Sequence, residues 1–129
     1  MPEHPNVSRH RHGHDAFRSG DVEFLADLFA EDTVWHWPGN GPFGGDFEGR
    51  DAVLDMLRKF GETPDSLEIV DEDCLASDTR TAALSHMTIA KGDKTLEVDL
   101  CEIVRWRDGK VAEEWLLVDD QYAYDEFWA

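Results

Sequence analysis

The stretch Thr33-Val34-Trp35-His36-Trp37-Pro38-Gly39 decides the fold, together with two shorter blocks that follow it. Its β-branched and aromatic residues favour a strand, which Pro38-Gly39 ends. Gly49-Arg50-Asp51-Ala52-Val53 then opens an amphipathic helix, and Asp108-Gly109-Lys110-Val111 joins two strands of a run of hairpins. This order predicts an α+β fold: a cone-shaped, curved antiparallel sheet wrapped over three helices, with an internal apolar pocket.

The remaining patterns complete this arrangement. Residues 1–8 contain two prolines and few apolar side chains, so we expect an extended or poorly ordered start, followed by a single domain over 9–129. Helices are expected up to Arg18, over 22–29 and over 50–60, with a loop at 40–49 between the first strand and the third helix. The aromatic-rich stretch 119–128 is expected to dock on the body. Four further strands are expected at Leu67–Ala76, Thr79–Lys91, Thr95–Arg107 and Lys110–Val118.

Composition limits the classes of partner and compartment. The 129 residues carry a formal net charge of −17 at pH 7, which repels phosphates and anionic lipids, so nucleic acid and membrane surfaces are poor partners. No apolar run approaches the roughly 20 residues that a membrane-spanning helix needs. Cys74 and Cys101 stand far apart with no metal-binding or redox spacing, and no secretory leader is evident, so a cytoplasmic location is expected.

The chain resembles the SnoaL-like branch of the nuclear-transport-factor-two-like superfamily in its element order and in four sequence blocks. The resemblance implies a curved sheet over helices, a pocket inside the cone and often a homodimer through the outer sheet face. This superfamily includes ketosteroid isomerases, polyketide cyclases, dehydratases and non-catalytic modules, so function must be argued from inward-facing residues. The blocks are Ala16–Asp21, Trp35–Gly39, Gly49–Val53 and Asp108–Val111.

Glu102 is the first candidate catalytic residue. It falls on the same face of its strand as Leu100, Val104 and Trp106. Burial among apolar side chains disfavours a charged carboxylate, which would make Glu102 a general acid or a neutral hydrogen-bond donor. It also lies near the place where ketosteroid isomerases carry an acidic oxyanion donor. The alternative is a glutamate at the sheet edge or paired with an arginine.

His86 and Glu114 are expected beside Glu102 if the neighbouring strands use the same alternation. On that reading Leu84, His86 and Thr88 face inward from one strand, and Glu114 and Leu116 from another. A histidine next to carboxylates in an apolar cavity can act as a base or proton shuttle near neutral pH. A hydrogen-bonded core histidine is the alternative for His86.

Trp37 marks a departure from the ketosteroid isomerases. Those enzymes carry an aspartate base immediately before the proline that ends the first strand, and their first-helix tyrosine would fall near Gly13. Trp35 and Trp37 are instead interpreted as walls for a flat apolar ligand, or alternatively as core packing. The expected substrate-binding residues are Trp35, Trp37, Leu57, Leu84, Thr88 and Leu116.

Two further sequence patterns bear on cofactor and metal binding. Gly39-Asn40-Gly41-Pro42-Phe43-Gly44 matches a dinucleotide-binding pattern, but no βαβ unit follows it. His10 and His14 share a helix face that could take up a metal ion or simply be exposed to solvent, since two histidines alone make a weak site. We therefore expect no cofactor and no metal.

These observations predict a small-molecule pocket protein. The leading hypothesis is a cofactor-free acid/base isomerase, cyclase or dehydratase acting on an apolar or polycyclic carbonyl compound, with Glu102, His86 and Glu114 as catalytic residues. The alternative is a non-catalytic ligand-binding or dimerisation module of the same fold. A homodimer is expected through the outer sheet face, which carries Cys101, Ile103 and Trp115.

Overall fold

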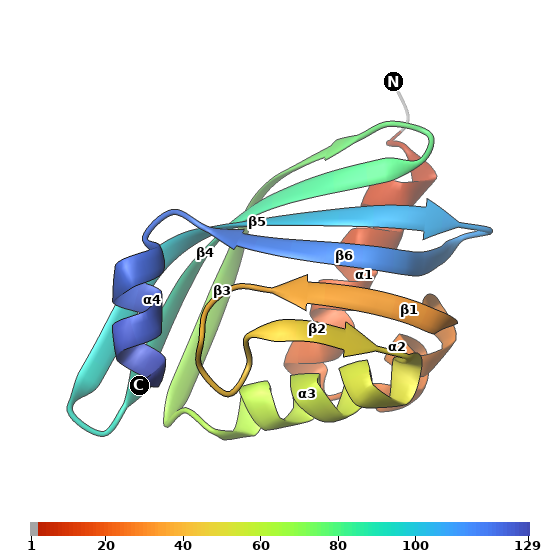
Figure 1. Cartoon of the computed structure of the whole chain (residues 1–129). Coiled ribbons are helices and arrows are strands. Elements are labelled where there is room, and N and C mark those ends of the chain that lie inside the picture. Colours follow the sequence, from red (N-terminus) through yellow and green to blue (C-terminus); the bar gives the residue numbers. More distant parts are fainter. Residues whose placement is uncertain (1–2) are drawn as a thin grey trace.

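A computed structural model describes residues 3–129 of the chain. One curved, six-stranded sheet is covered by helices (Figure 1), which confirms the predicted α+β fold. The strands lie in the order β2-β1-β6-β5-β4-β3. The elements are α1 (Pro5–Ser19), α2 (Val22–Leu28), β1 (Phe29–Trp37), β2 (Gly45–Glu48), α3 (Arg50–Glu62), β3 (Ser66–Ala76), β4 (Arg80–Lys91), β5 (Lys94–Arg107), β6 (Lys110–Val118) and α4 (Gln121–Trp128).

The sheet is mixed rather than wholly antiparallel. Strand β1 runs parallel to β6, with Trp35 opposite Glu114, while all the other strand pairs are antiparallel. Strand β2 lies inside the segment expected to be a loop. Its sequence Gly-Asp-Phe-Glu contains one large apolar residue, so its strand form depends on pairing with β1 rather than on local preference.

The start of the chain also differs from the expectation for residues 1–8. Helix α1 already begins at Pro5, and residues 1 and 2 lie outside the described part. The ring nitrogen Nδ1 of His4 accepts a hydrogen bond from the Asn6 backbone N–H at 3.1 Å, and proline suits the first helical position because it lacks an N–H. The buried Asn6 side chain then donates to the Asp78 carbonyl, which fixes this helix end against the β3–β4 turn.

The core lies between the concave face of the sheet and the helices. The apolar stripe of α3 is buried as predicted, and α3 packs against β1 and β2. The expected docking of the chain end also occurs: in α4, Trp128 packs edge-on against Phe43 with ring centroids 4.8 Å apart, and Tyr124 and Phe127 are buried beside it. These aromatic side chains of α4 thereby join the hydrophobic core. The stripe of α3 consists of Val53, Met56, Leu57 and Phe60.

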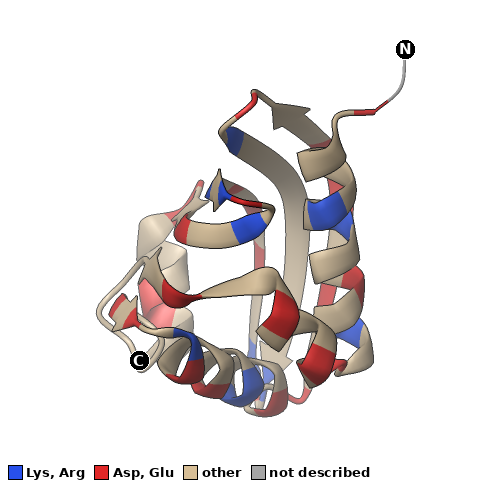
Figure 2. Ribbon diagram, turned by 90° about the vertical axis from the view of Figure 1, so that its right-hand side faces the viewer, with Lys and Arg blue, Asp and Glu red and all other residues tan. Residues whose placement is uncertain are grey.

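The charge distribution is that of a solvated acidic surface. Acidic residues, red in Figure 2, are spread over helices and strands alike, with fewer basic residues among them. Within the described residues, no helix has both the length and the apolar character that crossing a bilayer requires.

Candidate active site

The concave face of the sheet encloses one largely apolar pocket. Its cavity volume is about 80 Å³, and it lies between the sheet and the helices. Aromatic and aliphatic side chains form most of the wall, and a few polar side chains come from α1, β5 and β6. These polar residues are His10, His14, Arg18, Glu102 and Glu114.

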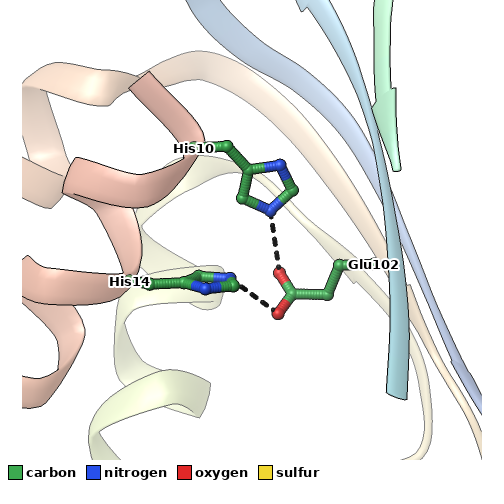
Figure 3. A group of neighbouring side chains, drawn as sticks. All are labelled: His10, His14 and Glu102. Atoms are coloured by element: carbon green, nitrogen blue, oxygen red, sulfur yellow. Dashed lines mark hydrogen bonds and ion pairs between the residues drawn. The ribbon is translucent and has the colours of Figure 1, made fainter. Parts of the chain in front are cut away.

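Two histidines of α1 point at Glu102 of β5 (Figure 3). His14 Nε2 lies 2.9 Å from Glu102 Oε1, and His10 Nε2 lies 3.5 Å from Glu102 Oε2. Both rings reach the same carboxylate because residues four apart share one face of a helix. Gly13 lets α1 approach α2 closely, since a Cβ at this position would sit 3.0 Å from Leu28 Cδ2.

His14 is held between two carboxylates. Its Nδ1 lies 2.8 Å from Asp71 Oδ1 on β3, while Nε2 faces Glu102, so the protonated ring can donate to both. Burial opposes the charged ring, but the attraction of Glu102 and Asp71 outweighs burial and raises the pKa of His14 to about 10. The hydrogen bond from His14 is also the main reason that the pKa of Asp71 falls to about 2.

His10 is fixed by a buried hydroxyl group. Its Nδ1 lies 2.8 Å from Thr81 Oγ1, which also accepts a hydrogen bond from the Trp106 indole N–H at 2.9 Å. Both His10 and Thr81 are buried, so the ring is oriented by contacts within the core. Its other nitrogen, Nε2, has no hydrogen-bond partner among the described residues and points at Glu102.

Glu114 of β6 completes the polar floor of the pocket. It is only 2% exposed, and the Trp37 indole N–H donates to its Oε2 at 3.0 Å. Burial, followed by the negative charge of Glu102 and a hydrogen bond to it, raises the pKa of Glu114 well above its usual range. A neutral Glu114 can therefore donate a hydrogen bond to an ionised Glu102.

The charge state of Glu102 is the reverse of the sequence-based expectation. Burial does oppose its ionisation, but the interactions with His14 and His10 outweigh burial and hold the pKa of Glu102 well below its usual range. The floor thus pairs an ionised Glu102 with a neutral Glu114. Two neighbouring carboxyl groups with opposite shifts can supply a proton acceptor and a proton donor in one site.

Six of the predicted site residues meet in this pocket, and three do not. Trp35, Trp37, Leu57, Glu102, Glu114 and Leu116 all line it. The prediction that Leu84, His86 and Thr88 face inward is wrong, because these residues project from the outer face of β4. There His86 lies 2.8 Å from Asp99 and 2.9 Å from Glu97, both on the outer face of β5.

The error on β4 has an identifiable cause. Around His86 the inward face carries the polar Ser85 and the outward face carries the apolar Leu84, so hydrophobic alternation there favours the wrong face, although Met87 and Ile89 further along are buried. The two-residue turn Gly92-Asp93 does determine which face His86 occupies, because it fixes the register of β4 against β5. It pairs Lys91 with Lys94, and counting back along both strands places His86 opposite Asp99, on the outer face.

Sequence reasoning missed the contribution of α1 and its supports. The sequence predicts that His10 and His14 form a metal-binding face or an exposed face, whereas the structure places both beside Glu102. Asp71 and Thr81 were not predicted at all. Only the four-residue spacing of the two histidines signalled a shared site, because the docking of α1 depends on contacts distant in sequence.

Comparisons with known proteins agree with this architecture. Bal32a, from a soil-derived mobile gene cassette, is 33% identical, covers 97% of this chain and 97% of its own, and superposes with a TM-score of 0.92. A protein with a cystatin-like fold from Xanthomonas campestris is 29% identical, with 95% and 97% coverage and a TM-score of 0.87.

A more distant structure shows the fold alone. IdmH, a suggested polyketide cyclase from Streptomyces antibioticus, is 21% identical, with 91% and 93% coverage and a TM-score of 0.73. No curated protein matches the chain significantly. The sequence model of the SnoaL-like domain matches residues 10–114, most of the chain. The protein therefore belongs to the SnoaL-like family.

Proposed function

We propose that this protein binds a small, largely apolar carbonyl compound in its pocket and catalyses proton transfer on it without a cofactor. The observation that carries the proposal is the neutral Glu114 beside the ionised Glu102 on the floor of an apolar pocket. An isomerase, a cyclase and a dehydratase all need a proton acceptor and a proton donor in such a place. Membership of the SnoaL-like family supports this choice of reactions.

The two carboxyl groups have different roles in this proposal. Glu102 takes a proton from a carbon next to the substrate carbonyl, and His14 keeps the carboxylate oriented through the 2.9 Å contact. When the substrate binds, Glu114 stops donating its hydrogen bond to Glu102 and donates it to the carbonyl oxygen. This hydrogen bond stabilises the negative charge that develops on that oxygen. Return of the proton from Glu102 to another carbon completes an isomerisation, so no electron acceptor is needed.

The aromatic wall favours a flat ligand. Trp35 and Trp37 lie nearly parallel, with ring centroids 6.4 Å apart, and Phe60 meets Trp37 edge-on at 4.9 Å. Flat apolar rings pack well against such surfaces. The similarity to IdmH in fold supports the inclusion of polyketide-like aromatic compounds among the candidates.

The test is a substrate screen followed by two conservative variants. Metal-free protein is screened with enolisable ketones and polyketide-like aromatic compounds. Glu102→Gln should lower turnover by roughly 10²–10⁴-fold, because glutamine cannot accept a proton. Glu114→Gln should lower turnover less, because an amide N–H donates a weaker hydrogen bond to the carbonyl oxygen than a carboxylic acid does. Glu68→Gln, an exposed carboxylate on β3, is the matched control and should keep full activity. Undiminished turnover in both pocket variants would refute these roles.

A non-catalytic binding protein is the second candidate. The observation that favours it is that both carboxyl groups already have partners in the protein, Glu102 with His14 and Glu114 with Trp37. Stoichiometric binding of a screened compound without turnover would select this alternative.

We further propose a homodimer formed through the outer face of the sheet. Leu84, Cys101 and Leu117 lie opposite one another on β4, β5 and β6 and form an apolar row across this face. Leu84 is 39% exposed and Leu117 is 53% exposed, so burying them would remove apolar area from water. A cytoplasmic location is part of the same proposal, since both cysteines are free thiols.

A further inference from the structure

We propose that His10, His14 and Glu102 form a binding site for one divalent transition-metal ion, such as Zn²⁺ or Co²⁺. The three residues offer two imidazole nitrogens and a carboxylate, a donor set that these ions accept. The site lies on the pocket floor, so an ion there would face a bound ligand.

The spacing of the donor atoms fits a shared ion. The three donor atoms all lie within 4.8 Å of one another, and the two histidine nitrogens lie 2.9 Å and 3.5 Å from the oxygens of Glu102. Ligand atoms bound tetrahedrally to one zinc ion are about 3.4 Å apart, given bonds of about 2.1 Å. Figure 3 shows the three groups converging from α1 and β5.

The far side of each ring is held in the way that metal-bound histidines are usually held. His14 Nδ1 faces the Asp71 carboxylate at 2.8 Å, and His10 Nδ1 faces the Thr81 hydroxyl group at 2.8 Å. Such partners fix the ring orientation. In His14, Nε2 binds the ion only after it loses the proton that it donates to Glu102 in the metal-free protein, so metal binding releases a proton. In both rings, Nε2 is the nitrogen directed at Glu102.

His10 supplies an independent observation. It is only 5% exposed, yet among the described residues its Nε2 makes no hydrogen bond and has only a long contact, 3.5 Å, with Glu102 Oε2. Buried polar atoms in proteins rarely lack a partner. A metal ion between His10, His14 and Glu102 would satisfy this nitrogen.

This inference goes beyond the proposed function. Three protein ligands leave at least one coordination position open, and here it faces the pocket, where a carbonyl or hydroxyl oxygen can bind. The ion would engage Glu102, so the metal-loaded protein could not use this carboxylate as its base. The metal-binding test below uses no substrate, so it succeeds or fails independently of turnover.

The test is titration of metal-stripped protein with Zn²⁺ by calorimetry and with Co²⁺ by visible absorption. We expect one ion per chain, with a cobalt spectrum typical of nitrogen and oxygen ligands. His10→Ala and Glu102→Gln should each weaken Zn²⁺ binding by at least about 100-fold, and Asp71→Asn by about 10–100-fold through loss of ring support. His12→Ala, which removes an exposed histidine of the same helix, should bind as the wild type does.

Circular dichroism of each variant separates loss of ligands from loss of fold. Absence of binding by the folded wild type would overturn the proposal. So would binding that survives both His10→Ala and Glu102→Gln, or binding lost only in His12→Ala, because these results would place the ion on surface groups.

Discussion

Replacing Glu114 by glutamine should stabilise the protein at neutral pH, although Glu114 is buried. The amide keeps both observed interactions, because its oxygen can accept from the Trp37 indole N–H and its NH₂ group can donate to Glu102. The glutamate, by contrast, must hold a proton in the folded state that the unfolded chain releases. Folding of the wild type therefore takes up a proton, and rising pH opposes it.

The magnitude follows from this single proton. The pKa of Glu114 is raised in the folded protein, so its favourable contribution is present below the ordinary value of 4.5 and is lost as pH rises above it. The loss is about 1.4 kcal/mol per pH unit while the proton is retained. The free energy of unfolding of Glu114→Gln minus that of the wild type should therefore increase by up to about 2.7 kcal/mol between pH 5 and pH 7. For a domain of this size, this corresponds to about 10 °C in Tm.

The assay is urea unfolding at pH 5, 6 and 7 in the presence of EDTA, followed by tryptophan fluorescence. Glu68→Gln controls for the loss of one negative charge from this acidic chain. Its free energy of unfolding should differ from that of the wild type by the same amount at all three pH values. If Glu114→Gln is less stable than the wild type at pH 7, with no dependence on pH, Glu114 is ionised in the fold and the reasoning fails. A stable Glu114→Gln protein with reduced turnover would also show that the reduction is not caused by unfolding.

The other predictions concern His14 and the outer sheet face. Because the pKa of His14 is raised from 6.5 to about 10, the protonated ring stabilises the metal-free protein fully below pH 6.5. This stabilisation decreases as the pH rises from 6.5 to 10. The free energy of unfolding of the wild type minus that of His14→Gln should fall over this window, and a constant difference would contradict the imidazolium assignment. Leu117→Glu should give monomers in light scattering at concentrations where the wild type and Glu68→Gln are dimers, and a monomeric wild type would refute the interface.

Local sequence patterns predicted most of the secondary structure. The stripe of Val53, Met56, Leu57 and Phe60 fixed the buried face of α3, because the periodicity of one helix is enough for that. Alternation on β5 likewise placed Glu102 on the inner face. Strand β2 could not be found in this way, because its pairing with β1 stabilises it more than its own residues do.

The charge states of the site could not be predicted from one strand. Glu102 alone on an apolar face implies a neutral acid, and only the arrival of His14 and His10 from α1 reverses this. Glu114 then becomes the neutral partner because Glu102 is ionised. Each pKa depends on groups brought together by tertiary packing, which a residue pattern does not contain.

The parallel pairing of β1 with β6 has a consequence for how the chain folds during synthesis. Strand β1 carries Trp35 and Trp37, but Trp35 pairs with Glu114, about 80 residues later in the chain. Until the ribosome has released β6, β1 lacks this neighbour and its aromatic side chains have no completed sheet to join. Nascent chains should therefore expose an unpaired, aggregation-prone strand edge until late in translation. We expect chaperones to bind the chain at this stage.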